Sequence, residues 1–190
     1  MANHSLIALC ALGGDQPVAH RIGGVTIAEN PALAMASLST RQGHDAGLAA
    51  AAERLFGFTL PGPGGMATGQ PWSAFWTGPG QWMVTAPFGS HEDIVAIVKP
   101  AVGDTASVTE QTDGWVRFEL QGPATVPMLQ RLCNADVEAM QAGQATRCQI
   151  EHLGTFLLCH EARQAFSVIT LRSGAASMLH ALETAAGAVA

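Results

Sequence analysis

Charge is scarce in this sequence of 190 residues. Charged residues make up 13% of the chain, and hydrophobic residues make up 48%. Soluble proteins carry about 25% charged residues on average. Such a chain has few solvated groups with which to cover its surface. Two explanations stay open: a composition rich in alanine and glycine, or a surface that another protein covers.

Positive charge is especially sparse. Lys99 is the one lysine, the eight arginines are scattered, and the net charge is −6. Nucleic acids and anionic membranes are bound by clusters of basic side chains, so we expect neither as a partner. The apolar run at residues 6–12 is too short to span a bilayer and has no basic leader. We therefore expect neither a membrane helix nor a signal peptide.

Closely spaced cysteines are also missing. The four cysteines form no CxxC motif; they are Cys10, Cys133, Cys148 and Cys159. This argues against a zinc knuckle or a local redox motif. We expect free, buried thiols, which are typical of a protein in the reducing cytoplasm.

Motifs of catalytic machinery are absent as well. No serine lies in GxSxG, no histidines form HxH or HExxH, and the glycine-rich stretch at 60–71 lacks the GK[ST] of a phosphate cradle. His152 and His160 lie on neighbouring predicted strands and could bind a metal with a nearby cysteine. The commoner meaning of such histidines is a half-buried strand position. Asp113 is either an ordinary turn residue or a catalytic carboxylate. We predict no catalytic, cofactor-binding or metal-binding residue.

The clearest structural unit is the stretch from residue 109 to 136. Asp113 and Gly114 predict a turn. The following residues alternate between apolar and polar over 115–120, which predicts a half-buried strand. Gly122 then breaks the strand, and Pro123 suits the first position of a helix.

Periodicity and turn residues predict the other elements. Strands are expected at 25–28, 33–38, 74–77, 81–86, 105–111, 147–152, 155–160 and 164–171, and helices at 44–56, 90–100 and 173–186. Gly57 is expected to end the first of these helices in a left-handed conformation. Ser90 and Ser173 are expected to cap the other two, and Pro100 to end the second.

The hairpin and helix at 74–100 match those at 158–186, with Trp82 on Phe166 and Val84 on Val168. This internal repeat predicts an α+β fold of two pseudo-repeated modules, each with an antiparallel sheet and packed helices. We place an N-terminal arm at 1–23, the first module at 24–104 and the second module at 105–190.

A partner surface is predicted from apolar residues in unstructured contexts. Trp72 lies in a proline-rich loop, and tryptophan is favoured at the centres of interfaces. The arm contributes Leu6, Ile7 and Leu9. These four residues are the candidate partner interface.

A family resemblance can be stated from longer motifs. The stretch 109–186, with its DGW…LQGP corner and its Asp136-Val137 pair followed by Gly143, resembles the gamma subunit of heterotetrameric sarcosine oxidase. The upstream hairpin WTGPGQWMV resembles it too. That family is related to the aminomethyltransferase (T-protein) of the glycine cleavage system. The resemblance covers about residues 24 to 186 and implies an aminomethyltransferase-like, folate-binding fold.

The resemblance also implies a function in a complex. The chain would be a small, non-catalytic subunit that packs against the large alpha subunit, with beta and delta subunits as further partners. The complex oxidatively demethylates sarcosine to glycine with O2, releases H2O2 and passes the one-carbon unit to tetrahydrofolate. FAD, FMN, NAD and tetrahydrofolate are expected in the other subunits, and none in this chain.

The alternative is a stand-alone folate-binding or one-carbon transferase module. In the aminomethyltransferase family the strand after a glycine like Gly154 carries acidic residues near the folate-reactive site. Here that strand, at 155–159, reads TFLLC and has no carboxylate. The gamma-subunit pattern also lacks these acids and is the better match.

Overall fold

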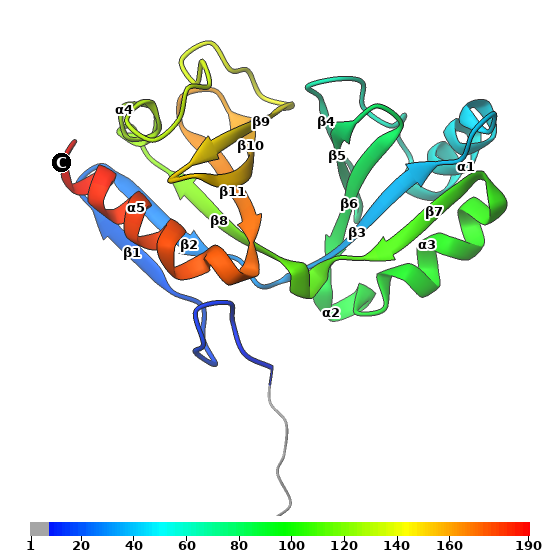
Figure 1. Cartoon of the computed structure of the whole chain (residues 1–190), viewed down its shortest axis with the longest axis horizontal. Helices are drawn as coiled ribbons and strands as arrows, with labels where there is room; N and C mark the ends of the chain where they lie inside the picture. Colours follow the sequence, from blue (N-terminus) through cyan, green and yellow to red (C-terminus); the bar gives the residue numbers. More distant parts are fainter. Residues whose placement is uncertain (1–7) are drawn as a thin grey trace, which may run out of the picture.

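Two antiparallel sheets, each with helices on its outer side, organise residues 8–190, which are the part of the chain that this computed structural model describes (Figure 1). The six-stranded sheet runs in the order β1 (Ala19–Ile22), β2 (Val25–Glu29), β8 (Trp115–Gln121), β11 (Ala165–Leu171), β10 (Leu153–Glu161), β9 (Gln144–Ile150). The five-stranded sheet runs in the order β4 (Met66–Thr68), β5 (Ser73–Gly78), β6 (Gln81–Pro87), β3 (Leu33–Thr40), β7 (Ala106–Glu110).

Helices cover only the outer faces of the two sheets, so the layers follow each other as helix, sheet, sheet and helix (Figure 1). The five-stranded sheet carries α1 (Asp45–Phe56) and α3 (Ile94–Val102), and the six-stranded sheet carries α4 (Thr125–Gln130) and α5 (Ala175–Gly187). A short helix, α2 (Phe88–His91), precedes α3. No helix in the described residues is long and apolar enough to cross a bilayer.

The strand orders show the predicted repeat. Reading β9, β10, β11, β8, β2 in one sheet corresponds to reading β4, β5, β6, β3, β7 in the other. The α+β fold of two similar modules is therefore confirmed. The sheets nevertheless exchange strands across the predicted boundary at 104/105: β2 joins the sheet of the second module, and β7 joins that of the first. The chain crosses between the sheets twice, at 30–32 and at 111–114, near the base of the molecule in Figure 1.

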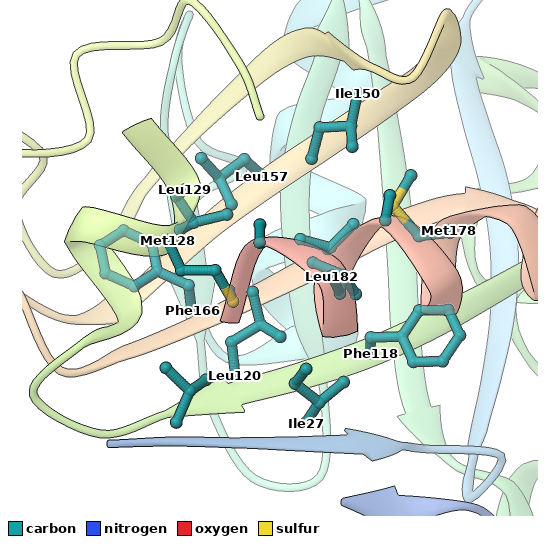
Figure 2. Packing of buried hydrophobic residues seen from close by; sticks show 14 of the residues in the cluster. Ile27, Phe118, Leu120, Met128, Leu129, Ile150, Leu157, Phe166, Met178 and Leu182 are labelled. Carbon is teal, nitrogen blue, oxygen red and sulfur yellow. The ribbon is translucent and has the colours of Figure 1, made fainter. Parts of the chain in front are cut away.

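The largest core lies between the six-stranded sheet and its helices (Figure 2). The alternation predicted for β8 is confirmed, because Val116, Phe118 and Leu120 are all buried on this side. Met178 and Leu182 of α5 are fully buried against the same cluster. An isolated helix of 13 residues is only marginally stable in water, so α5 is stabilised mainly by burying these side chains.

The opposite face of β8 looks toward the other sheet. Trp115 packs against Phe156 at a ring-centroid distance of 5.6 Å, and Phe156 lies 5.3 Å from Phe75 of the five-stranded sheet. Five further buried side chains complete this cluster between the sheets: Met35, Met83, Ala145, Leu158 and Ile169. Both faces of β8 are therefore covered, whereas the sequence pattern predicts one covered face.

A second connection joins the outer edges of the two sheets. Met66 N donates to Gly143 O at 2.7 Å, and Ala145 N donates to Gly64 O at 2.9 Å. Gly64 and Gly143 have φ values of 71° and 84°, which favour glycine. These hydrogen bonds tie the start of β4 to the start of β9, and they lie in and beside the glycine-rich stretch at 60–71, which contains β4.

Several helix ends differ from the sequence prediction. Ser90 does not cap α3; the cap is Asp93, whose carboxylate accepts from Ala96 N at 3.0 Å. Pro100 does not end that helix, which continues to Val102. Pro100 has no N–H, so it removes one hydrogen bond from the last turn of this helix without ending it.

The other two corrections concern α4 and α5. Ser173 lies in a short 3-10 turn, and α5 follows Gly174 with no side-chain cap. α4 begins at Thr125 and not at Pro123. The prediction for Gly57 is confirmed: its φ is 77° and its N–H donates to Glu53 O.

Candidate functional site at the junction of the sheets

The end of the predicted arm is part of the fold. Its last residues form β1, the edge strand beside β2. Glu29 of β2 is 5% exposed, and its carboxylate accepts from Ala11 N at 2.7 Å and from Val18 N at 3.5 Å. A buried carboxylate needs such donors. Glu29 therefore fixes the segment 8–18 against the junction of the two sheets.

A cavity of about 240 Å3 lies between this segment and the two crossings. Its walls include Cys10, Met35, Phe88, Trp115 and Arg172. We call this region the arm junction. On one side of the cavity Arg172 connects the end of β11 to the segment 8–18, because its guanidinium donates to Leu9 O at 2.5 Å.

The candidate interface residues differ in how far the structure exposes them. Trp72 was predicted to be exposed, and this is wrong: it is 5% exposed, between the Phe56 ring at 5.3 Å and the His91 ring at 4.7 Å. The loop folds back over α1 because burying the indole outweighs the local proline and glycine preference for exposure. Leu6 and Ile7 lie outside the described residues. Leu9 is 49% exposed.

Leu9 has an exposed apolar neighbour at the arm junction. Leu171, at the end of β11, is 51% exposed and directly precedes Arg172, which binds the Leu9 carbonyl. Ile97 on α3 is the other large apolar side chain that is exposed in the described residues. Leu9 lines the cavity of the arm junction, and Leu171 adjoins Arg172 of its wall. We call these two exposed side chains the apolar rim.

A polar cluster lies directly beside the arm junction, on the inner face of the six-stranded sheet. Glu119 is its centre: it accepts from Asn30 Nδ2 at 2.9 Å and from the Ser167 hydroxyl, and Arg117 Nε lies 2.6 Å from its Oε1. The Arg117 contact is an ion pair, because its N–H does not point at the oxygen. His160 Nε2 lies 2.6 Å from Ser167 Oγ.

The environment of the cluster shifts two pKa values. Burial alone would raise the pKa of Glu119, but the positive charge of Arg117 and the hydrogen bonds from Ser167 and Asn30 outweigh it. The pKa of Glu119 is therefore below its ordinary value. Burial, and then the charge of Arg117, lower the pKa of His160. At neutral pH the cluster holds a carboxylate, a guanidinium and a neutral imidazole.

This arrangement does not resemble a hydrolase triad. In a triad the carboxylate orients the histidine, and the histidine activates an accessible serine. Here Glu119 bonds to Ser167 directly, and Ser167 is fully buried. The cluster binds the crossing at Asn30 to β8, β10 and β11. Sequence reasoning missed it because Arg117 and Glu119 alternate with core residues, as solvent-facing residues do.

The two histidines proposed as metal ligands are far apart. His152 lies in the turn before β10, with φ of 65°, and β9 ends before it at Ile150. His160 is near the other end of β10, about 26 Å away at the rise of a strand. In residues 8–190 no group of three or more His, Cys, Asp and Glu side chains gathers to hold a metal.

Asp113 lies in the second crossing and is a turn residue, as one of its two interpretations predicts. It belongs to the 3-10 turn Thr112–Gly114, and its side chain is 96% exposed. Its carboxylate pairs with Arg172, at 3.8 Å from Nη1 to Oδ1. Exposed pairs of this kind contribute roughly 0–1 kcal/mol.

Of the comparisons with known proteins, the one with solved structures finds proteins similar to this chain. No protein-family model and no curated protein sequence matches the chain. A chain of the heterotetrameric sarcosine oxidase from Corynebacterium sp. U-96 superposes with a TM-score of 0.76 and 21% identity, over 88% of this chain and 88% of that one. The two chains share one fold.

The glycine cleavage system aminomethyltransferase T from Bartonella henselae also has this fold. It superposes with a TM-score of 0.63 and 12% identity, over 85% of this chain and 46% of the transferase. The chain thus spans about half the length of the transferase. The aminomethyltransferase-like fold that the motifs predict is confirmed by both superpositions.

Proposed function

We propose that this protein is the small gamma subunit of a heterotetrameric sarcosine oxidase, without chemistry of its own. The observation that carries the proposal is the nearly end-to-end superposition on a chain of such an oxidase, in which 88% of each chain is matched. The transferase extends well beyond the matched region. In size as well as fold, this chain corresponds to the oxidase chain.

The chemistry of the described residues supports a non-catalytic role. The polar groups of the cluster form hydrogen bonds with one another, and the β10 segment 155–159 is buried throughout. That segment is where the transferases carry acidic residues near folate. In the complex, oxidative demethylation of sarcosine with O2 and transfer of the one-carbon unit to tetrahydrofolate would belong to the alpha, beta and delta subunits. These subunits would hold FAD, FMN, NAD and the folate.

The contact with the large alpha subunit is proposed at the arm junction. Leu9 and Leu171 expose about half of their surface there, beside a cavity with mainly apolar walls. Covering two large apolar side chains and filling a cavity are the features of an interface centre. The low charge of the chain agrees with a surface that a partner covers.

Co-expression tests the proposal. The chain would be produced with the alpha, beta and delta subunits of a sarcosine oxidase and followed by gel filtration. The double variant Leu9→Asp/Leu171→Asp places charge on the rim, and Ile97→Asp is the matched control on a distant exposed helix. We expect the wild type and the control to co-elute with the large subunits, and the double variant to elute alone.

The outcomes separate two errors. If the wild type never co-elutes, the proposed function is wrong. If the double variant co-elutes as well as the control does, the function stands and the contact lies elsewhere. Calorimetry of the isolated chain with a tetrahydrofolate derivative tests the alternative, since heat of binding and a thermal shift would identify a stand-alone folate-binding module.

A further inference from the structure

Two cysteines that are distant in the sequence line the same surface depression, and Cys133 packs against the core cluster that contains Cys148. Cys133 follows the C-terminal end of α4, and Cys148 lies in the middle of β9. Each side chain shifts the pKa of the other, and the Cys133 thiol itself donates to Leu129 O at 3.5 Å. The sequence has no CxxC motif and therefore no local redox pair. The fold instead brings together two cysteines that are 15 residues apart in the chain, 133 and 148.

The pair is open to small solutes. Both cysteines line a wide depression of about 830 Å3, and Cys133 is half-buried while Cys148 is 8% exposed. Arg131, Arg147 and His152 line the same depression. Glu151 lines it too, so its two arginines face one carboxylate. A molecule as small as hydrogen peroxide can reach the half-buried Cys133 from this depression, and nearby arginines favour the thiolate form of a cysteine.

The two thiols have different acidities. The hydrogen bond from Cys148 lowers the pKa of Cys133 to about 6; burial acts against this, and a hydrogen bond from the Ala135 backbone adds to it. The same contact and burial raise the pKa of Cys148. Cys133 therefore has the lower pKa of the two thiols and is also the more accessible one, and the thiolate is the reactive form of a cysteine.

The other two cysteines provide an internal reference. Cys10 is 8% exposed and Cys159 is fully buried. Burial raises the pKa of both thiols. They are inert by the same criteria that make Cys133 reactive.

We propose that Cys133 and Cys148 form a peroxide-oxidised dithiol, with Cys133 as the attacking thiolate and Cys148 as the resolving thiol. The Cys133 sulfur attacks one peroxide oxygen; the S–O bond forms, the O–O bond breaks, and the released hydroxide takes up a proton to become water. The Cys148 sulfur then attacks the sulfenic sulfur of Cys133. The S–S bond forms, the S–O bond breaks, and the hydroxide leaves as water with the Cys148 proton.

In sum, two thiols lose two electrons and two protons, and one hydrogen peroxide is reduced to two waters. The oxidant is hydrogen peroxide itself, so the step does not depend on the proposed oxidase function. In a complex that releases hydrogen peroxide, the oxidant would form close to the dithiol.

Mass spectrometry of the reduced, full-length chain tests the proposal. The protein is freed of reductant, treated with increasing hydrogen peroxide at pH 7, alkylated and digested. We expect a peptide pair joined by a Cys133–Cys148 disulfide, an intact mass lower by two hydrogens, and full reversal by dithiothreitol. Without peroxide, iodoacetamide should label Cys133 at least about tenfold faster than Cys159, because Cys133 is accessible and has a lowered pKa whereas Cys159 is fully buried.

Variants separate the two roles. Cys148→Ser should leave a Cys133 sulfenic acid that dimedone traps, Cys133→Ser should abolish disulfide formation, and Cys159→Ser should behave as the wild type. The proposal is overturned if wild-type Cys133 is oxidised no faster than Cys10 and Cys159. It is also overturned if Cys133 proceeds to sulfinic acid with no bond to Cys148. Both results are read on the wild-type chain, so they do not depend on whether a variant folds.

Discussion

Replacing Arg117 with methionine should show how strongly the polar cluster joins the two sheets. Methionine keeps much of the apolar stem and removes the charge. Glu119 then stays beside the arm junction with hydrogen bonds from Ser167 and Asn30 but with no positive partner. The structural question is how much free energy of unfolding the lost charge represents.

The magnitude follows from exposure. Two charges about 4 Å apart interact by about 4 kcal/mol at an effective dielectric of 20. The side chains of Arg117 and Glu119 are 13% and 32% exposed, so solvent screens part of this energy. The cost lies between that of an exposed pair, roughly 0–1 kcal/mol, and that of a buried one, roughly 3–5 kcal/mol. We expect Arg117→Met to lower the free energy of unfolding by about 2 kcal/mol at pH 7.

The cost should depend on pH. Because the pKa of Glu119 is lowered in the folded protein, its contribution is present above pH 4.5 and is lost as the pH falls through the folded pKa. His160 also reduces the cost of Arg117→Met at lower pH. Without the charge of Arg117 the pKa of His160 rises, so below pH 6.5 a protonated His160 can pair with Glu119. The effect of Arg117→Met should therefore shrink between pH 7 and pH 4.

Urea unfolding of four proteins measures these effects: wild type, Arg117→Met, Glu119→Gln and the double variant. In the Glu119→Gln background the cost of Arg117→Met should fall below about 1 kcal/mol, because no buried carboxylate is left unpaired. A cost that is the same in both backgrounds and at pH 7 and pH 4 would refute the electrostatic reasoning. The loss would then come from packing.

Three further predictions follow from single positions. Trp72→Ala should lower the free energy of unfolding by about 3–5 kcal/mol, as expected for a buried aromatic side chain, whereas exposed Leu9→Ala should change it by less than about 0.5 kcal/mol; equal effects in urea unfolding would contradict this assignment. Asp93→Ala should cost about 1 kcal/mol through loss of the α3 cap, and Ser90→Ala less than half as much, again by urea unfolding; the reverse order would restore Ser90 as the cap. Wild-type stability should decline from pH 7 to pH 5, since the folded state resists protonation of His160, and His160→Gln should flatten that part of the profile; an unchanged slope would show that other groups cause the decline.

Local patterns predicted the elements well, because their causes are local. The alternation in β8, the left-handed cap at Gly57 and the hairpin of β10 and β11 depend on neighbouring residues. The helix starts were less accurate. Several residues near each start can cap, and tertiary packing decides among Ser90, Asp93 and their neighbours.

The features beside the candidate site could not be read from local patterns. In the fold β2 pairs with β8, and β3 pairs with β7. Local patterns favour a different pairing, a hairpin between strands that follow each other in the chain. The burial of Arg117 and Glu119 depends on a second sheet that covers their face of β8. One signal was present: Trp115 lies on that same face, and an aromatic side chain is unusual on a strand face in contact with water. The placement of Cys133 and Cys148 at one depression had no local signal.

The exchange of strands between the sheets has a consequence for biosynthesis. Thr26 pairs with Gln121, about 95 residues further along the chain, and the sheet that contains β3 is incomplete until β7 has been made. The five-stranded sheet can therefore be completed only after β7 has emerged from the ribosome, and β1 and β2 must wait for β8. A chain cut at 104/105 would yield two fragments with unpaired strand edges, which associate with each other or aggregate. The interlocked strands make the two similar halves a single cooperative unit.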